Sequence, residues 1–129
     1  MSQTTNAPYF AVLHGQNYIS LTTFRKNGAA VPTPVWFAQE GDKLVMLTFE
    51  KAGKVKRLRN NNMVEVAPCD MRGNIKGDKV TAKARFLSSE EGKKANQLLS
   101  RKYGIQKRLF GLMNIFSKQQ PIFLEITPA

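Results

Sequence analysis

The residues best suited to chemistry form a basic stretch, Thr48 to Asn62, which reads T-F-E-K-A-G-K-V-K-R-L-R-N-N-N. An apolar run over 43–49 leads into it, and Val55 and Leu58 lie one helical turn apart inside it. A helix that starts there places free N–H groups and the positive end of its macrodipole among lysines and arginines. An anion such as a phosphate would stabilise that arrangement. The same residues equally suit a solvated basic face on a surface helix, so both interpretations stay open at this point.

The overall charge also points to an anionic partner. The 129-residue chain has 20 Lys and Arg against 9 Asp and Glu, a formal net charge of +11. Such a balance suggests nucleic acid, an acidic membrane lipid or a phosphorylated ligand. A basic barrel that binds single-stranded nucleic acid normally also offers aromatic side chains on which bases stack. Residues 51–59 contain none, which argues against nucleic acid as the partner.

Hydrolytic chemistry is poorly supported by the residue types. The chain has one histidine, His14, and one cysteine, Cys69, and it lacks a G-x-S-x-G elbow or paired carboxylates at a useful spacing. It also lacks a Walker loop and a dinucleotide-binding G-x-G-x-x-G motif. A lone histidine at a helix end is typical of packing or capping, and the apolar neighbours of Cys69 indicate a small buried side chain. We therefore assign no catalytic side chain and no metal ligand; if the protein is an enzyme, a bound cofactor carries the chemistry.

Length and composition indicate a single domain over 1–129, with the polar residues 1–7 expected to be disordered. No apolar run approaches the length that crosses a bilayer. The first residues lack the basic start and the apolar core of a signal peptide. We expect a cytoplasmic protein with no membrane partner.

Hydrophobic patterning predicts the elements that must position the basic stretch. The predicted strands span residues 18–24, 30–38, 43–49, 63–68, 78–87 and 121–127. The predicted helices span residues 8–14, 53–59, 89–103 and 105–116, with Ser88 and Glu91 forming a capping box at the start of the third. Asn27-Gly28 is a strong hairpin signal, and Pro32 and Pro34 predict that the strand after it is irregular or exposed along one edge.

These elements favour an α+β fold that is mainly β. Six strands with interspersed helices are most simply arranged as an antiparallel sheet that curls into a barrel, with the helices packed around it.

Several short motifs in a fixed order resemble the pyridoxamine 5′-phosphate oxidase-like split β-barrel superfamily. They are T-P-V-W-F at 33–37, L-T at 47–48 and G-K-V-K-R-L-R-N-N at 53–61. The resemblance extends through 64–70 and 80–87, and it takes in R-K-Y-G-I-Q-K-R-L at 101–109 and L-E-I-T-P at 124–128. Within the superfamily the chain is most similar to the small flavin/deazaflavin-dependent oxidoreductase branch.

The resemblance implies a six-stranded antiparallel split β-barrel of the FMN-binding type, forming a homodimer with two cofactor sites at the subunit interface. It implies that Lys54 binds the cofactor phosphate, and Arg57 shares the helix face of Lys54 better than Lys56 does. The residues implied to line the ring and the ribityl chain are Thr33, Pro34, Val35, Trp36, Leu47 and Thr48.

Departures from the family pattern argue against a true pyridoxamine phosphate oxidase. Those enzymes carry an arginine on the second strand, where this chain has Val31-Pro32-Thr33. They also end in an arginine- and proline-containing segment, where this chain ends Thr127-Pro128-Ala129. Gly53 stands where the family has an arginine before the phosphate lysine, and Gly77 stands where a glutamine is expected.

The implied reaction is hydride transfer between the cofactor, FMN or the deazaflavin coenzyme F-420, and a small organic substrate. The lysine- and asparagine-rich composition favours FMN, whereas the family branch favours the deazaflavin, and both stay open. The alternatives are a non-catalytic split barrel that binds flavin or haem, and a basic nucleic-acid-binding barrel.

Overall fold

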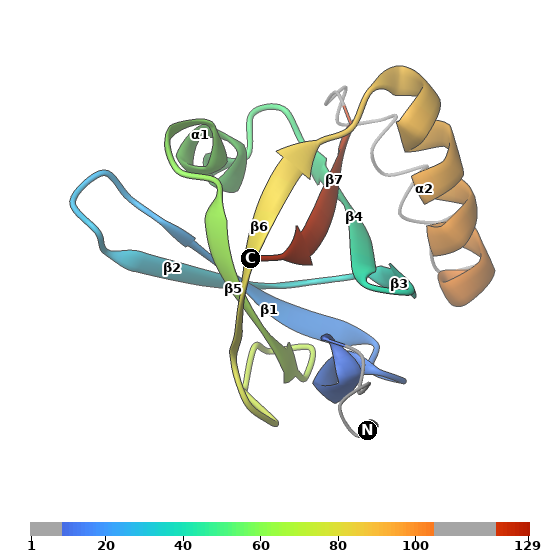
Figure 1. Cartoon of the computed structure of the whole chain (residues 1–129), viewed down its shortest axis with the longest axis horizontal. Coiled ribbons are helices and arrows are strands. Elements are labelled where there is room, and N and C mark those ends of the chain that lie inside the picture. The colour runs from blue at the N-terminus through green and yellow to red at the C-terminus, as the bar shows by residue number, and fades with distance from the viewer. Residues whose placement is uncertain (1–8, 105–120) are drawn as a thin grey trace.

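The computed structural model describes residues 9–104 and 121–129. Within these residues it has seven strands, two α-helices and a 3-10 turn at Ala11–Leu13 (Figure 1). The strands are β1 Tyr18–Phe24, β2 Ala30–Val35, β3 Ala38–Glu40, β4 Lys43–Phe49, β5 Met63–Cys69, β6 Val80–Phe86 and β7 Pro121–Pro128. The helices are α1 Gly53–Asn60 and α2 Ser89–Tyr103. The expectations for residues 1–7 and for a helix over 105–116 fall outside the described residues.

No helix of the described ranges has the length and apolar character needed to span a bilayer.

Local patterns predicted most of these elements correctly. Strands β1 and β4 have the predicted bounds, and β6 alternates as expected, with Ala82 and Ala84 buried and Lys83 exposed. The hairpin between β1 and β2 is confirmed. Its turn uses Gly28 at φ +89°, a conformation that side chains other than glycine rarely adopt.

The prediction of six strands is wrong, because the stretch 30–38 divides into β2 and β3. Residues 36–37 leave the ladder between them: the N–H of Phe37 donates to the hydroxyl of Tyr103 (2.9 Å) instead of to a neighbouring strand. Of the two expectations raised by Pro32 and Pro34, exposure along one edge is confirmed, because β2 is an edge strand, whereas its pairing with β1 is regular.

The sheet is strongly curled. Its strand order is β2-β1-β5-β6-β7-β4-β3, so β2 and β3 form opposite edges although only two residues separate them. A flat sheet of this order would hold its edges about 29 Å apart at ~4.8 Å per strand step, whereas the short link spans at most about 11 Å. Figure 1 shows the link running from β2 across to β3, beside α2. Every strand pair is antiparallel, and no β2–β3 pairing is recorded among the described residues, so the sheet is open rather than a closed barrel.

Two apolar cores hold the sheet and the helices together. The first fills the inside of the curl, and its fully buried members include Leu21, Met46, Leu124 and Ile126. The second packs α2 against β3 and β4, and its members are Ala38, Val45, Ala95, Leu99 and Tyr103 with Trp36, Leu47, Leu87, Leu98 and Phe123 around them.

The lone cysteine, Cys69, is buried, as its neighbours predicted, and burial raises the pKa of its thiol.

The start of α2 is fixed by the predicted capping box. The Ser88 hydroxyl accepts from the N–H of Glu91, and the Glu91 carboxylate accepts from the N–H of Ser88. Arg85 of β6 joins this carboxylate (2.6 Å) and also Glu125 of β7 (2.9 Å). The network therefore ties the helix start to the sheet surface.

We expect this network to make stability depend on pH in the acid range. The Arg85 guanidinium, followed by the capping hydrogen bonds, lowers the pKa of Glu91 from 4.5 to about 2. A carboxyl with a depressed folded-state pKa stabilises the fold above its unfolded pKa, and this contribution is lost as pH falls toward the folded value. Urea unfolding between pH 5 and pH 2 should show that loss, and Glu91→Gln should flatten it. An unchanged pH profile in Glu91→Gln would show that the ion pair adds nothing.

Candidate functional site

A cavity of about 400 Å³ lies where the ends of β2 and β4 meet the start of α1 and the side of α2. Figure 1 shows α1 and α2 on opposite sides of the sheet, and each helix contributes a residue to the lining of this cavity. The lining residues are Tyr18, Pro34, Val35, Trp36, Leu47, Thr48, Phe49, Ala52, Lys54 and Leu99.

The structure brings together six of the eight site residues expected from the sequence. They are Pro34, Val35, Trp36, Leu47, Thr48 and Lys54. Phe49 follows the predicted Thr48, and Ala52 lies two residues before the predicted Lys54, so both were missed only by the choice of bounds. Tyr18 and Leu99 were missed because they come from β1 and α2, and nothing in the local sequence connects them with the basic stretch.

Thr33, the seventh expected residue, is not among those that line the cavity. It pairs in register with Leu21, a fully buried core residue, and directly opposed residues of antiparallel strands share a face. Its hydroxyl is buried and has no hydrogen-bond partner among the described residues.

Lys54 supplies the positive end of the cavity. It is the second residue of α1 and is half-buried, and burial, followed by the charge of Arg57, lowers its pKa. Within the described ranges no carboxylate forms an ion pair with it, the first turn of α1 has no acidic residue, and Ala52 provides no side-chain cap. A half-buried ammonium beside the positive end of a helix is unfavourable unless an anion is supplied.

Arg57, the eighth expected residue, lies beside the cavity without lining it. Its Nε donates to the Thr23 hydroxyl (2.6 Å), and Nη1 lies 2.9 Å from the position that a Cβ on Gly53 would take. Burial, followed by the charge of Arg25, lowers its pKa. Arg57 therefore strengthens the positive field next to Lys54, and Gly53 leaves room for its guanidinium.

Gly77, where the family pattern has a glutamine, has little space for any side chain. A Cβ there would lie 2.8 Å from Cγ of Pro68 and 3.2 Å from Cγ2 of Val12. Contacts that short force a neighbouring atom to shift. The local packing of this chain thus explains the glycine.

The cavity has the composition of a site for a planar ring that carries an anionic chain. Its volume lies within the range of small-molecule sites, about 300–1,000 Å³. Val35, Trp36, Leu47, Phe49 and Leu99 provide apolar and aromatic walls, while Lys54 lies on the side of α1. A flavin or deazaflavin with its phosphate fits this set of residues.

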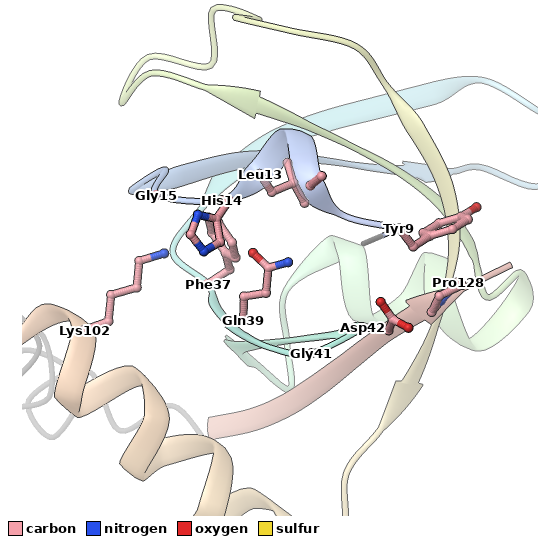
Figure 2. A pocket seen from close by; sticks show the side chains of 11 residues that line it. Tyr9, Leu13, His14, Gly15, Phe37, Gln39, Gly41, Asp42, Lys102 and Pro128 are labelled. Atoms are coloured by element: carbon pink, nitrogen blue, oxygen red, sulfur yellow. The ribbon is translucent and has the colours of Figure 1, made fainter. Parts of the chain in front are cut away.

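A second and larger hollow, of about 1300 Å³, opens beside the 3-10 turn (Figure 2). In Figure 2 Lys102 of α2 points toward His14 across this hollow. The Lys102 ammonium, however, is already bound to the carbonyl of Gln16 (2.6 Å) and lies 3.6 Å from the centre of the Phe37 ring. No group of three or more His, Cys, Asp or Glu side chains in the described part of the chain could hold a metal ion. We assign this hollow no chemistry.

Comparison with known proteins agrees with the fold. The sequence model of the family described as pyridoxamine 5′-phosphate oxidase matches residues 7–125. No curated protein matches the sequence.

Several solved structures have a similar fold at low sequence identity. The haem storage protein HutZ from Vibrio cholerae is 15% identical with a TM-score of 0.66, covering 89% of this chain and 83% of its own. A haem-binding protein from Mycobacterium smegmatis is 11% identical with a TM-score of 0.67, covering 98% of this chain and 52% of its own. An F420 reductase is 16% identical with a TM-score of 0.61, covering 94% and 93%. At these identities the likeness establishes the fold alone.

Proposed function

The chain belongs to the pyridoxamine 5′-phosphate oxidase family, and we propose that it is an oxidoreductase of the small flavin/deazaflavin-dependent branch. In this proposal it transfers hydride between FMN or the deazaflavin coenzyme F-420 and a small organic substrate. A neighbour of the same fold is an F420 reductase, which supports the branch.

The observation that carries the proposal is the half-buried Lys54 at the edge of an otherwise largely apolar cavity. Its ammonium has no ion-pair partner within residues 9–104 and 121–129, and Arg57 adds a second positive charge beside it. Phosphate is the simplest ligand group that compensates both charges. The apolar walls formed by Trp36 and Leu47 suit the ring that such a cofactor attaches to its phosphate.

In this mechanism the protein would bind and orient the cofactor and the substrate, and the cofactor would supply the two-electron hydride chemistry. Lys54 and the start of α1 would hold the anionic chain of the cofactor. Trp36, Leu47 and Leu99 would contact the ring and keep water from it, which would strengthen electrostatic interactions in the cavity. No side chain of the cavity needs to act as a nucleophile.

The proposal is tested by binding and turnover together. We expect purified protein to bind FMN or coenzyme F-420 with micromolar affinity or better, seen as a shift of the cofactor's absorbance or a change of its fluorescence. Bound cofactor should then be reduced or oxidised with a panel of nicotinamide donors, quinones and enones. If neither cofactor binds, the proposal is ruled out. If a cofactor binds but no turnover is seen, the protein is a cofactor carrier and not an enzyme.

A haem-binding role is the second candidate, because two neighbours of the same fold are described as haem proteins. The chain has a single histidine, His14, and it lines the larger hollow rather than the cavity around Lys54. A haem in the smaller cavity would therefore lack the commonest axial ligand. A Soret band on mixing with haemin, abolished by His14→Ala, would favour this candidate instead.

Nucleic acid remains the weakest candidate. Among the described residues Tyr9 is the exposed large aromatic side chain, and its hydroxyl donates to the carbonyl of Thr81 (2.6 Å). Over residues 9–104 and 121–129, no other exposed large aromatic side chain offers the stacking platform that single-strand binding uses. A filter-binding titration across salt concentrations would show a steep slope if nucleic acid were the ligand.

We also propose a homodimer with the two cofactor sites at the subunit interface, as the family resemblance implies. The cavity is partly lined by Pro34 and Val35 of the edge strand β2, which supports a site completed by a second subunit. Light scattering should give twice the 14.5 kDa mass of the chain. A mass equal to one chain would contradict it.

A further inference from the structure

Trp36, which lines the cavity, is stacked on Tyr103 at the end of α2. The two ring centres are 4.4 Å apart, and the ring planes are inclined by 7°. Parallel aromatic rings at this distance make an extensive contact. One face of the indole therefore rests against a side chain that is 67 positions later in the chain and lies outside the cavity lining.

The Tyr103 ring is in turn fixed by its hydroxyl. The hydroxyl oxygen accepts from the N–H of Phe37 (2.9 Å), and its hydrogen lies within reach of two carbonyls, those of Phe37 (2.9 Å) and Asn17 (2.7 Å). Phe37 belongs to the two-residue link between β2 and β3, where strand pairing does not serve these backbone groups. Tyr103 thus binds the backbone next to Trp36 and supports its ring at the same time.

The surroundings hold Tyr103 firmly in place. It is buried with Leu99 and Ala95 in the core between α2 and the β3–β4 edge of the sheet. Burial raises the pKa of its phenol to about 12, so the hydroxyl keeps its hydrogen at physiological pH.

We propose that Tyr103 is a positioning residue that holds Trp36 as the rigid aromatic wall of the cavity, so that helix α2 sets the affinity for the cofactor ring. A wall that is ordered before binding loses less side-chain entropy when the ring binds, and this raises affinity. The effect acts on the ring and not on the phosphate, which Lys54 binds at the other helix. The inference rests on the proposed function in one respect only: that the ring bound against Trp36 is a flavin or deazaflavin ring.

The first test needs no cofactor. Trp36 is the only tryptophan of the chain, so fluorescence excited at the red edge of the tryptophan band, where tyrosine does not absorb, reports on it alone. We expect Tyr103→Leu to lower the fluorescence anisotropy of Trp36 and to increase its quenching by acrylamide. Tyr103→Phe keeps the stacked ring and loses only the hydroxyl, so its change should be smaller and in the same direction. Tyr9→Leu is the matched control, because it removes a tyrosine whose ring contact is with Phe10, and it should change neither signal.

The second test distinguishes the contribution of the cofactor ring to affinity from that of the phosphate. Each variant is titrated with FMN and with riboflavin, which has the same ring but no phosphate, or with coenzyme F-420 and its phosphate-free chromophore. We expect Tyr103→Leu to weaken both ligands of a pair equally, by about three- to tenfold. Lys54→Ala should weaken only the phosphorylated one. Circular dichroism confirms that each titrated variant is folded. If Tyr103→Leu is unfolded, Tyr103→Phe takes its place in the titrations.

The outcomes distinguish the two proposals. If the native protein binds none of these ligands, the proposed function fails, while the fluorescence test still decides whether Tyr103 holds Trp36. If folded Tyr103 variants keep native anisotropy and quenching, the positioning role is wrong. It is also wrong if they lose affinity for FMN but not for riboflavin, since the effect would then lie at the phosphate.

Discussion

Replacing Lys54 with alanine is expected to weaken FMN or F-420 binding by about 10- to 100-fold. The estimate follows from the roughly 1.5–3 kcal/mol that a hydrogen bond to a charged group contributes, at about 1.4 kcal/mol for each tenfold in affinity. Lys54 lines the cavity and is half-buried, whereas Lys56, two residues later on the same helix, is exposed. Lys56→Ala removes the same charge from the chain and should change the affinity by less than about twofold, because exposed charges are well screened. Fluorescence titration at fixed ionic strength measures both.

The ionic strength dependence provides a further check on Lys54. A phosphate bound by a half-buried ammonium is less screened than one bound by surface charge. The native protein should therefore keep most of its affinity between low and physiological salt. Equal losses in Lys54→Ala and Lys56→Ala would indicate a diffuse basic surface instead of a defined phosphate site.

Replacing Leu124 with alanine is expected to cost about 2–5 kcal/mol of unfolding free energy, a large part of the roughly 5–15 kcal/mol typical of a domain. Leu124 is fully buried in β7, where it pairs with Met46 of β4 and with Phe86 of β6. Truncation removes apolar contacts on the inside of the curl and leaves a cavity that a strand paired on both sides cannot easily fill. Urea unfolding, followed by Trp36 fluorescence and by circular dichroism, measures the change.

Met71→Ala is the matched control for this truncation. Met71 has a side chain of similar size but is 67% exposed in the loop between β5 and β6. Its loss should change stability by less than about 0.5 kcal/mol. Comparable losses in the two variants would show that the inside of the curled sheet is not the main core.

The variants Leu124→Ala and Lys54→Ala should each change only one property, the first stability and the second affinity for the cofactor. Leu124 does not itself line the cavity, so folded Leu124→Ala protein should bind cofactor with near-native affinity. Lys54→Ala should unfold like the native protein or at slightly higher urea, since it removes a poorly compensated charge.

The sequence by itself determined the features that depend on neighbouring residues. The bounds of β1 and β4, the turn at Gly28 and the capping box between Ser88 and Glu91 all follow from side-chain period, glycine conformation and capping chemistry. The family motifs then led to six residues that line one cavity. Residues adjacent in sequence to a strand end remain adjacent in the fold, which is why that part of the site was predictable.

Only the tertiary structure decided which distant residues complete the site. Where 30–38 divides into β2 and β3, the hydroxyl of Tyr103 takes the place of a strand partner at Phe37. Tyr18 and Leu99 join the lining because the sheet curls and α2 packs on its edge. Arg57 turns to Thr23 because Gly53 leaves space for its guanidinium. Each of these contacts joins parts of the chain that local patterns treat separately, and their geometry is set by packing. The candidate site in the basic stretch is thus defined by the curled sheet, which places Lys54 at the edge of a cavity with aromatic walls.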